Sequence, residues 1–177
     1  YYLMWLARVM LHQEKKAFFL LGRFGSAEAI FHAEASEIRH ALGSANKLAD
    51  QILNQRKAEL LDEWIAELEE KNIFFYSYFH PSYPMLLKQI YNPPLGIYVR
   101  GTLPDDNIDR VGVIGARRCS SYGASVAYRI TKDLGKTNVI VVSGLAKGID
   151  AVAHKGIMDG GGKTIAAMLA KELGVNC

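Results

Sequence analysis

Between Arg110 and Thr164 the chain repeats one pattern that restricts its fold more than any other feature. An apolar, β-branched run ends in a glycine turn that carries a basic residue, and a helix start follows. The pattern occurs first in R-V-G-V-I-G-A-R-R-C-S-S-Y-G and again in V-I-V-V-S-G-L-A-K-G-I-D-A-V-A-H. Strand, glycine turn and helix in this order are how proteins hold an anion at the carboxyl edge of a parallel sheet.

The elements around these turns predict an α/β fold with a Rossmann-like, doubly wound parallel sheet. The first strand is a continuous apolar run, which suits a strand covered on both faces. The predicted elements are a strand over Val111 to Ile114, a helix from Tyr122 to Gly135 capped by Ser121, a strand over Val139 to Val142, a helix from Ala151 to Asp159 capped by Asp150, and a strand over Thr164 to Leu169. Three or four strands make half of such a domain, so we expect the chain to be a fragment of it.

Residues 1–70 predict a small all-helical domain. Leu60, Leu61, Trp64, Ile65 and Leu68 recur at helical spacing opposite a set of acidic residues, which is typical of an amphipathic helix that packs on its neighbours. The other predicted helices run from Tyr1 to Leu21, from Ala27 to Ala35 with Ser26 as cap, from near Ser36, and from Gly43-Ser44 through Gln55.

Residues 71–110 are expected to join the helical domain to the sheet domain, 111–177. Ile73 to Phe79 is a β-prone run with five aromatic residues and no interleaved Lys or Arg. We therefore expect these rings to fill a core rather than to form a surface on which bases stack. A short helix over Met85 to Ile90 and a strand over Leu95 to Arg100 follow.

Two basic side chains are the main candidates for binding an anion. Arg117 follows the first strand's turn and Lys147 follows the second's. Neighbouring parallel strands lie only about 4.8 Å apart, so we expect the two turns to be adjacent and both cations to reach one phosphate. The predicted phosphate site consists of Gly115, Arg117, Arg118, Ser120, Ser121, Gly144, Lys147 and Gly148, with Tyr122, Asp150, His154 and Lys163 as candidate supporting residues.

Structural roles compete with several of these assignments. Gly115 and Gly144 fit tight turns equally well, Asp150 fits a helix cap better than a catalytic base, and His154 fits a hydrogen-bonded core residue better than a ligand. The run G-G-G-K-T is not a P-loop, because Ile157 stands where the first glycine belongs and a strand follows instead of a helix. No G-x-G-x-x-G follows the first strand, so neither a dinucleotide nor another cofactor is expected.

Charge and composition narrow the function classes. The net charge is only +3, yet from Arg110 onward ten basic residues stand against four acidic ones. Such an excess fits a polyanionic partner, although alone it is more often a solvated surface. The two cysteines, Cys119 and Cys177, have neither a disulfide framework nor metal-ligand spacing, which favours a reducing cytoplasm and no metal. No membrane-length apolar run and no nucleophile–base pair are visible, so neither a membrane span nor catalysis is expected.

Taken together, the motifs resemble the DNA-processing protein A family (DprA, also called Smf). G-A-R-R-C-S-S-Y-G is similar to the family's G-S-R-x-x-S-x-Y-G, and S-G-L-A-K-G-I-D-A-V-A-H and G-G-K-T-I-A follow as they do there. The segment from Tyr83 to Gly101, Y-P-x-L-L-K-x-I-x-x-P-P-L-x-I-Y-V-R-G, matches the family's junction. After Met168 the sequence departs from the family's pattern, and its later basic and glycine-rich motifs are missing.

The resemblance implies a protein that binds single-stranded DNA, protects it and hands it to the RecA recombinase during natural transformation. It implies that Arg117 grips phosphate, that Lys147 occupies a basic position of the second loop, and that the protein forms a homodimer in the cytoplasm through parts beyond this chain. Residues 1–70 are loosely similar to the family's N-terminal domain, which resembles helix-hairpin-helix or sterile-alpha-motif modules. We interpret this acidic module as a packing or protein-contact domain, with direct DNA contact as the alternative.

A nucleotide enzyme on a related Rossmann-like sheet is the competing hypothesis. In a nucleoside-monophosphate phosphoribohydrolase the same two turns would hold the phosphate of one mononucleotide. The P-G-G-x-G-T-x-x-E signature of that family does not occur in this sequence.

Overall fold

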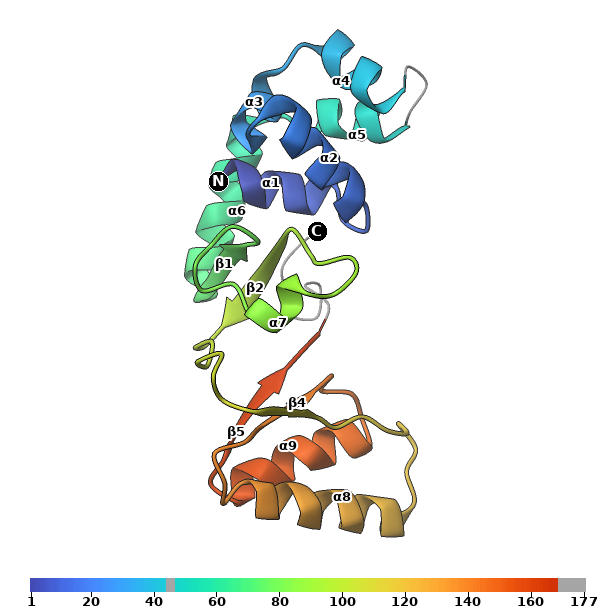
Figure 1. The fold of residues 1–177 in the computed structure, drawn as a ribbon, viewed down its shortest axis with the longest axis vertical. Coiled ribbons are helices and arrows are strands. Elements are labelled where there is room, and N and C mark those ends of the chain that lie inside the picture. The colour runs from blue at the N-terminus through green and yellow to red at the C-terminus, as the bar shows by residue number, and fades with distance from the viewer. Residues whose placement is uncertain (44–46, 169–177) are drawn as a thin grey trace. The chain divides into compact units, whose positions relative to one another are not determined.

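A computed structural model describes residues 1–43 and 47–168 of the chain. These residues divide into two compact units, with the boundary between Leu103 and Pro104 (Figure 1). The expected helix start at Gly43-Ser44, the strand end at Leu169 and Cys177 fall wholly or partly outside the described residues. No helix in the described ranges combines the length and the apolar character that crossing a membrane requires.

The first unit contains six helices among its described residues, followed by two strands that flank a short helix. The helices are α1 Tyr2–Val9, α2 Glu14–Phe24, α3 Ala27–His32, α4 Ala35–Leu42, α5 Lys47–Asn54 and α6 Ala58–Glu70. They are followed by β1 Ile73–Ser77, α7 Met85–Lys88 and β2 Gly96–Arg100. Ser26 caps α3 as predicted, because its hydroxyl accepts the Ala29 N–H at 3.0 Å.

The single helix expected over Tyr1 to Leu21 is wrong. The chain turns between α1 and α2, where His12 adopts a left-handed conformation with φ 64°. The reason lies in burial: Trp5 and Leu6 of α1 and Leu20 of α2 all belong to one core cluster. A straight helix of that length would be about 30 Å long and could not bring both apolar faces onto one small core.

The segment after α6 packs with the helices rather than standing between two domains. β1 and β2 pair as an antiparallel ribbon, with Phe74 opposite Val99. Leu95 joins the helical core, and the hydroxyl of Tyr98 accepts a hydrogen bond from Arg8 Nε of α1 at 2.9 Å. The compact unit therefore extends to Leu103, beyond the expected boundary at residue 70.

The expectation that all five aromatic residues of this run fill a core is only partly met. Ile73 is buried, whereas Phe74 and Phe79 are exposed. Phe74 points to the open face of the β1–β2 ribbon, because successive side chains of a strand point to opposite faces, and Phe79 follows the end of β1 at Ser77.

The second unit is built on a parallel sheet in the order β3-β4-β5. Its elements are β3 Arg110–Gly112, α8 Ser121–Leu134, β4 Ile140–Ser143, α9 Ile149–Asp159 and β5 Lys163–Ala166. Val111 pairs with Val141, which in turn pairs with Thr164. This arrangement is the predicted Rossmann-like α/β fold, preceded by the predicted helical part.

Both helices of this unit lie on the same face of the sheet (Figure 1). Val141 of β4 packs there against Ala153 and Ile157 of α9. The first strand was expected to be covered on both faces, and this is wrong: Val111 and Ile114 are exposed. β3 is an edge strand of the described sheet, and its helices shield only one side.

Candidate functional site

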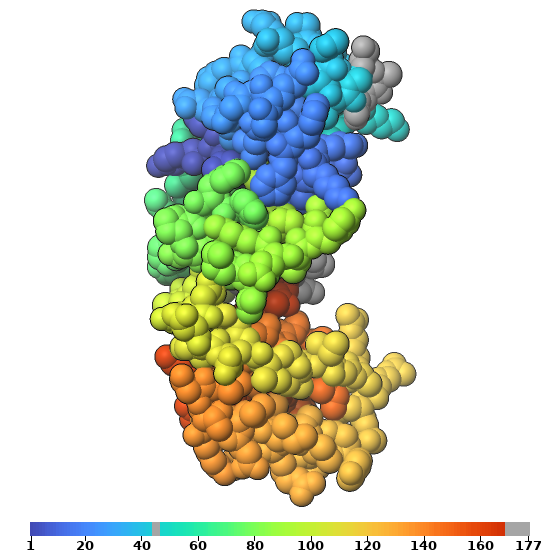
Figure 2. Space-filling view, viewed as in Figure 1, coloured from blue at the N-terminus to red at the C-terminus, as the bar shows by residue number. Residues whose placement is uncertain are grey.

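Two loops meet at the carboxyl edge of the parallel sheet, loop 113–120 after β3 and loop 144–148 after β4. β3 and β4 are neighbours and run in parallel, so both loops leave the sheet at the same edge. The N–H of Ile149 donates to the carbonyl of Ala116 at 3.3 Å, which ties the two loops together. Loop 113–120 lies on the molecular surface (yellow in Figure 2).

Gly148 makes this close approach possible. Its backbone has φ +87°, and a Cβ there would lie 2.2 Å from the carbonyl oxygen of Ala116 and 2.7 Å from that of Arg117. Gly115 has a similar role, because a Cβ there would lie 2.7 Å from the Cβ of Ile149. The room that Gly115 leaves is thus occupied by Ile149, and the loops pack backbone against backbone.

The cations of the two loops are exposed. Arg117 and Arg118 project from the first loop and Lys147 from the second. Within residues 1–43 and 47–168, no carboxylate forms an ion pair with any of the three. The backbone of Arg117 lies against Gly148, which directly follows Lys147, so the two loops that carry these cations are in contact.

The N-terminus of α8 opens beside these cations. Ser120, not the predicted Ser121, is the cap: its hydroxyl accepts the N–H of Gly123 at 3.1 Å. Ser121 is the first helical residue, and Tyr122, next to it, is 78% exposed. The first turn of α8 contains no acidic residue. The positive end of the helix dipole, with the first-turn N–H groups other than that of Gly123, is therefore available to an anion.

Asp150 is not the predicted helix cap. α9 begins at Ile149, and its N-cap is Gly148. The buried carboxylate of Asp150 instead accepts the N–H of Gly144 at 3.2 Å. This hydrogen bond fixes the turn that follows β4. We therefore assign Asp150 the role of positioning loop 144–148.

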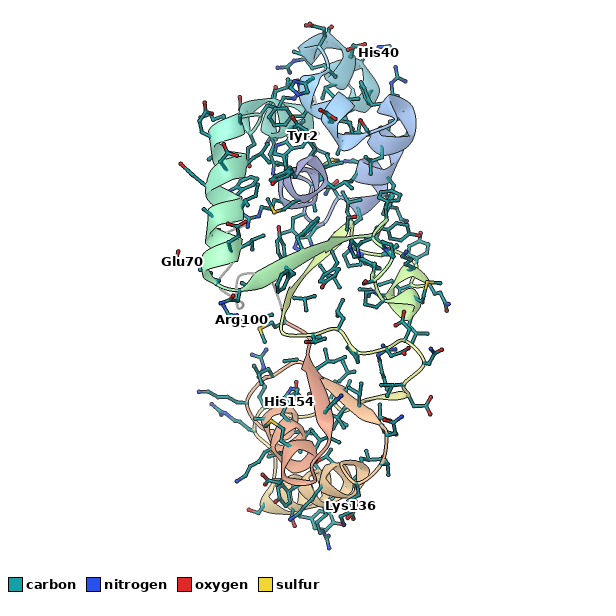
Figure 3. All side chains as sticks on the ribbon, turned by 90° about the vertical axis from the view of Figure 1, so that its left-hand side faces the viewer. Tyr2, His40, Glu70, Arg100, Lys136 and His154 are labelled. Carbon is teal, nitrogen blue, oxygen red and sulfur yellow. The ribbon has the colours of Figure 1, made fainter. Side chains whose placement is uncertain are left out.

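His154 lies between α9 and the sheet, 4% exposed (labelled in Figure 3). Its Nδ1 lies 2.7 Å from the hydroxyl of Thr164, which donates its own proton to the carbonyl of Val141 at 2.7 Å. Nδ1 must then be the donor to Thr164, so the neutral ring carries its proton there. This contact is the one expected of a hydrogen-bonded core residue. Burial lowers the pKa of His154 below 6.5, while the Asp150 carboxylate acts in the opposite direction.

The structure does not bring Lys163 to the site. Lys163 pairs with Ile140 at the start of the parallel strands, whereas Ser143 and Ala166 pair at their carboxyl ends. Three residues of strand separate the two positions, a distance of about 10 Å. A basic residue close to a glycine turn in the sequence therefore lies at the opposite edge of the sheet.

Two residues that shape the site were not anticipated from the sequence. Ile149 fills the space beside Gly115, and its Cδ1 lies 3.8 Å from where a Cβ on Gly123 would be. Ser143, buried at the end of β4, donates its hydroxyl to the carbonyl of Val113 at 2.7 Å. An isoleucine directly after a loop glycine and a serine closing an apolar strand are the signals that could have identified them. The described residues hold no group of three or more His, Cys, Asp or Glu side chains suited to a metal ion.

Comparisons with known proteins point to one family. The chain is 31% identical over 153 residues to the protein Smf of Synechocystis, an alignment that covers 84% of this chain and 38% of that protein. It is 40% identical over 86 residues to the DNA processing protein DprA of Streptococcus pneumoniae, covering 49% of this chain and 30% of the relative. The chain thus spans well under half the length of these relatives.

The fold is shared with a solved structure. The crystal structure of DNA processing protein A from Streptococcus pneumoniae superposes with a TM-score of 0.67 at 24% identity, covering 94% of this chain and 56% of that one. Residues 74–175, more than half of the chain, match the family described as DNA recombination-mediator protein A. The chain therefore belongs to the DprA/Smf family of DNA recombination-mediator proteins.

Proposed function

We propose that the chain binds single-stranded DNA, with the phosphates held at the sheet edge between loops 113–120 and 144–148. The observation that carries this proposal is the pairing of exposed Arg117 and Lys147 on two loops joined by the Ile149–Ala116 hydrogen bond. A phosphate placed there would meet a guanidinium, an ammonium group and the N–H groups of the first turn of α8 together.

Chemistry at this edge favours binding over reaction. Asp150 is engaged by Gly144, and His154 is buried beneath the sheet with its proton directed to Thr164. Neither side chain is placed to attack or to protonate a phosphate on the loops. We therefore propose a binding role without catalysis for the described residues.

For the whole protein we propose protection of incoming DNA and its transfer to the RecA recombinase during natural transformation. Family membership supports this proposal, since the family is described by its mediation of DNA recombination and its relatives by DNA processing. A cytoplasmic location, a homodimer and a RecA-binding surface belong to the same proposal. These roles extend beyond the part of the relatives that this chain spans.

Replacing Arg117 tests the binding site directly. We expect Arg117→Ala to weaken binding of a fluorescein-labelled oligothymidylate by about 1–3 kcal/mol, because a charge-assisted contact to phosphate is lost. The salt dependence of the affinity should become shallower by about 0.7 in log–log slope, the share of one phosphate contact on a single strand. Fluorescence anisotropy at two salt concentrations measures both quantities.

Arg129→Ala is the matched control. Arg129 is an exposed arginine of α8. It lies eight residues after Ser121, the first residue of that helix, which corresponds to about 12 Å along the helix axis. It should leave the affinity within about twofold of wild type. Equal losses in the two variants would show that only the overall charge matters and would refute the site.

Competition separates the proposal from a nucleotide enzyme. An unlabelled oligonucleotide should displace the labelled strand, whereas a nucleoside monophosphate at the same phosphate concentration should not. Displacement by the monophosphate, together with release of free base from it, would favour the phosphoribohydrolase hypothesis instead.

A further inference from the structure

Exposed rings and lysine side chains meet where α2 packs against the segment around α7. Tyr91 is 88% exposed, and Lys15 Nζ lies 3.9 Å from the centroid of its ring. The neighbouring Asn92 amide donates to the Glu14 carboxylate of α2 at 3.0 Å. Figure 2 shows the surface of α2 (blue) beside that of this segment (yellow-green).

A second ring–lysine arrangement contacts the same side of α2, because Phe18 follows Lys15 by three residues in that helix. Phe79 is 57% exposed, and its ring contacts Phe18 of α2 with centroids 6.4 Å apart and Tyr78 with centroids 5.4 Å apart. Lys88 Nζ lies 5.3 Å from the Tyr78 ring centroid. We call Lys15, Phe18, Tyr78, Phe79, Lys88 and Tyr91 the aromatic–lysine patch.

The charge of this region suits a polyanion. From Asn72 to Pro104 the chain contains no Asp or Glu at all. Lys15 and Lys88 supply positive charge beside the rings, and the Glu14 carboxylate is engaged by the backbone N–H of His12 and by Asn92. The acidic residues of this unit gather elsewhere, with six of them on α6.

Rings and ammonium groups side by side are what a single strand requires. Every base has a π-face that stacks on an exposed aromatic ring, and the phosphates between bases pair with nearby lysines. The run Ile73 to Phe79 lacks its own basic residues, but the fold brings Lys88 of α7 to Tyr78 and the ring of Phe18 of α2 to Phe79. An apolar protein segment would use the same rings without needing the lysines beside them.

We propose that the aromatic–lysine patch is a second contact surface for single-stranded nucleic acid, with bases stacking on Tyr91 and Phe79 and phosphates meeting Lys15 and Lys88. This inference rests on the proposed function, since the same strand would bind the sheet edge through its phosphates. Both surfaces would contact phosphates, but only the patch would also contact bases.

The experiment compares an oligothymidylate with an abasic oligonucleotide of the same length, both titrated against the full chain. Wild type should bind the oligothymidylate more tightly than the abasic strand. Tyr91→Ala and Phe79→Ala should each lower the affinity for oligothymidylate about fivefold or more and leave the abasic affinity unchanged, which reduces the ratio between the two ligands. Tyr1→Ala is the matched control, because Tyr1 is a comparably exposed tyrosine (79%) that precedes α1.

Photocrosslinking gives an independent readout. An oligonucleotide carrying 5-iododeoxyuridine should form adducts at Tyr91 or Phe79, identified by mass spectrometry of the digested protein. Unchanged ratios in Tyr91→Ala and Phe79→Ala with no adducts at either ring would overturn the inference and point to a protein partner for the patch. In that case Arg117→Ala would still lower the affinity for both oligonucleotides if the sheet-edge proposal holds. The two proposals can therefore be refuted independently.

Discussion

The helical core around Arg8 and the sheet edge around Arg117 use the same side chain in opposite ways. Arg8 is buried: its guanidinium lies 4.5 Å from the Trp64 ring centroid and 5.5 Å from that of Tyr98. Its Nη2 lies 3.6 Å from a carboxylate oxygen of Glu67. Arg117 is exposed on loop 113–120 and forms no ion pair within the described residues.

Arg8 and Arg117 differ in whether the protein itself supplies the group that compensates the positive charge. Arg8 obtains its compensation from rings and a carboxylate of the same unit, so its charge holds helices and ribbon together. Arg117 forms no such ion pair in the described part of the chain, and its loop leads into the N-terminus of α8, whose first turn contains no acidic residue. A cation left without an internal partner beside N–H donors is suited to an anion from outside.

Removing Arg8 should have the largest effect of all. We expect Arg8→Ala to lower the free energy of unfolding by about 3 kcal/mol, because Glu67 and the Tyr98 hydroxyl lose a buried partner and a cavity remains. Urea unfolding followed by tryptophan fluorescence measures the loss. DNA affinity, determined where the variant is folded, should match wild type.

Arg8→Met separates charge from volume. It refills most of the space, so its loss of stability should be smaller than that of Arg8→Ala. If Arg8→Ala were to weaken DNA binding without changing unfolding, the contrast between the two arginines would be broken.

Gly148→Ala should come next. The alanine would have to adopt φ +87° with its Cβ 2.2 Å from the Ala116 carbonyl, so the two loops would be forced apart. We expect a loss of about 2–3 kcal/mol in unfolding free energy, and weaker DNA binding because Arg117 and Lys147 lose their common support.

Gly161→Ala is the control that separates the effect of the steric clash at Gly148 from the effect of a positive φ. Gly161 also has a positive φ, +84°, but nothing lies within 4 Å of a Cβ there. It should cost about 1 kcal/mol and leave DNA affinity unchanged. Equal effects of the two alanines on DNA affinity would contradict the role of loop packing.

Local patterns in the sequence predicted most of the second unit. The order of three strands and two helices follows from alternating apolar runs and glycine turns, and the adjacency of the two loops follows from parallel pairing. The same patterns could not show that Ile114 is exposed, because strand periodicity does not reveal how many faces of a sheet are covered.

Contacts between distant segments set the limit of prediction. Lys163 follows glycines in the sequence, yet the register of β5 places it at the wrong edge for the phosphate site. The break at His12 and the meeting of Lys15 with Tyr91 both depend on how the first unit closes on its core. Neither feature could be predicted from hydrophobic periodicity, because each depends on contacts between residues that are far apart in the sequence.

Ser120→Ala should have a smaller effect. Loss of the cap on the Gly123 N–H is expected to lower the free energy of unfolding by about 1 kcal/mol. Ser121→Ala, one residue later inside the helix, should change stability by only a few tenths of that amount. The reverse ranking in thermal unfolding would restore Ser121 as the cap and move the start of α8 away from Arg117.

The smallest effect concerns His154, the buried group beneath the edge. Its pKa is lowered below 6.5 in the folded chain, mainly by burial, so the unfolded state binds more protons as the pH falls through 6.5. Stability from this residue is therefore complete above that pH and declines below it, by at most about 1.4 kcal/mol per pH unit for one proton.

Urea unfolding at pH 7.5, 6.5 and 5.5 should show this decline in wild type and in His40→Gln, an exposed control. His154→Gln should be less stable at pH 7.5 but should lose less on acidification. A decline of the same size in His154→Gln would assign the pH dependence to another group.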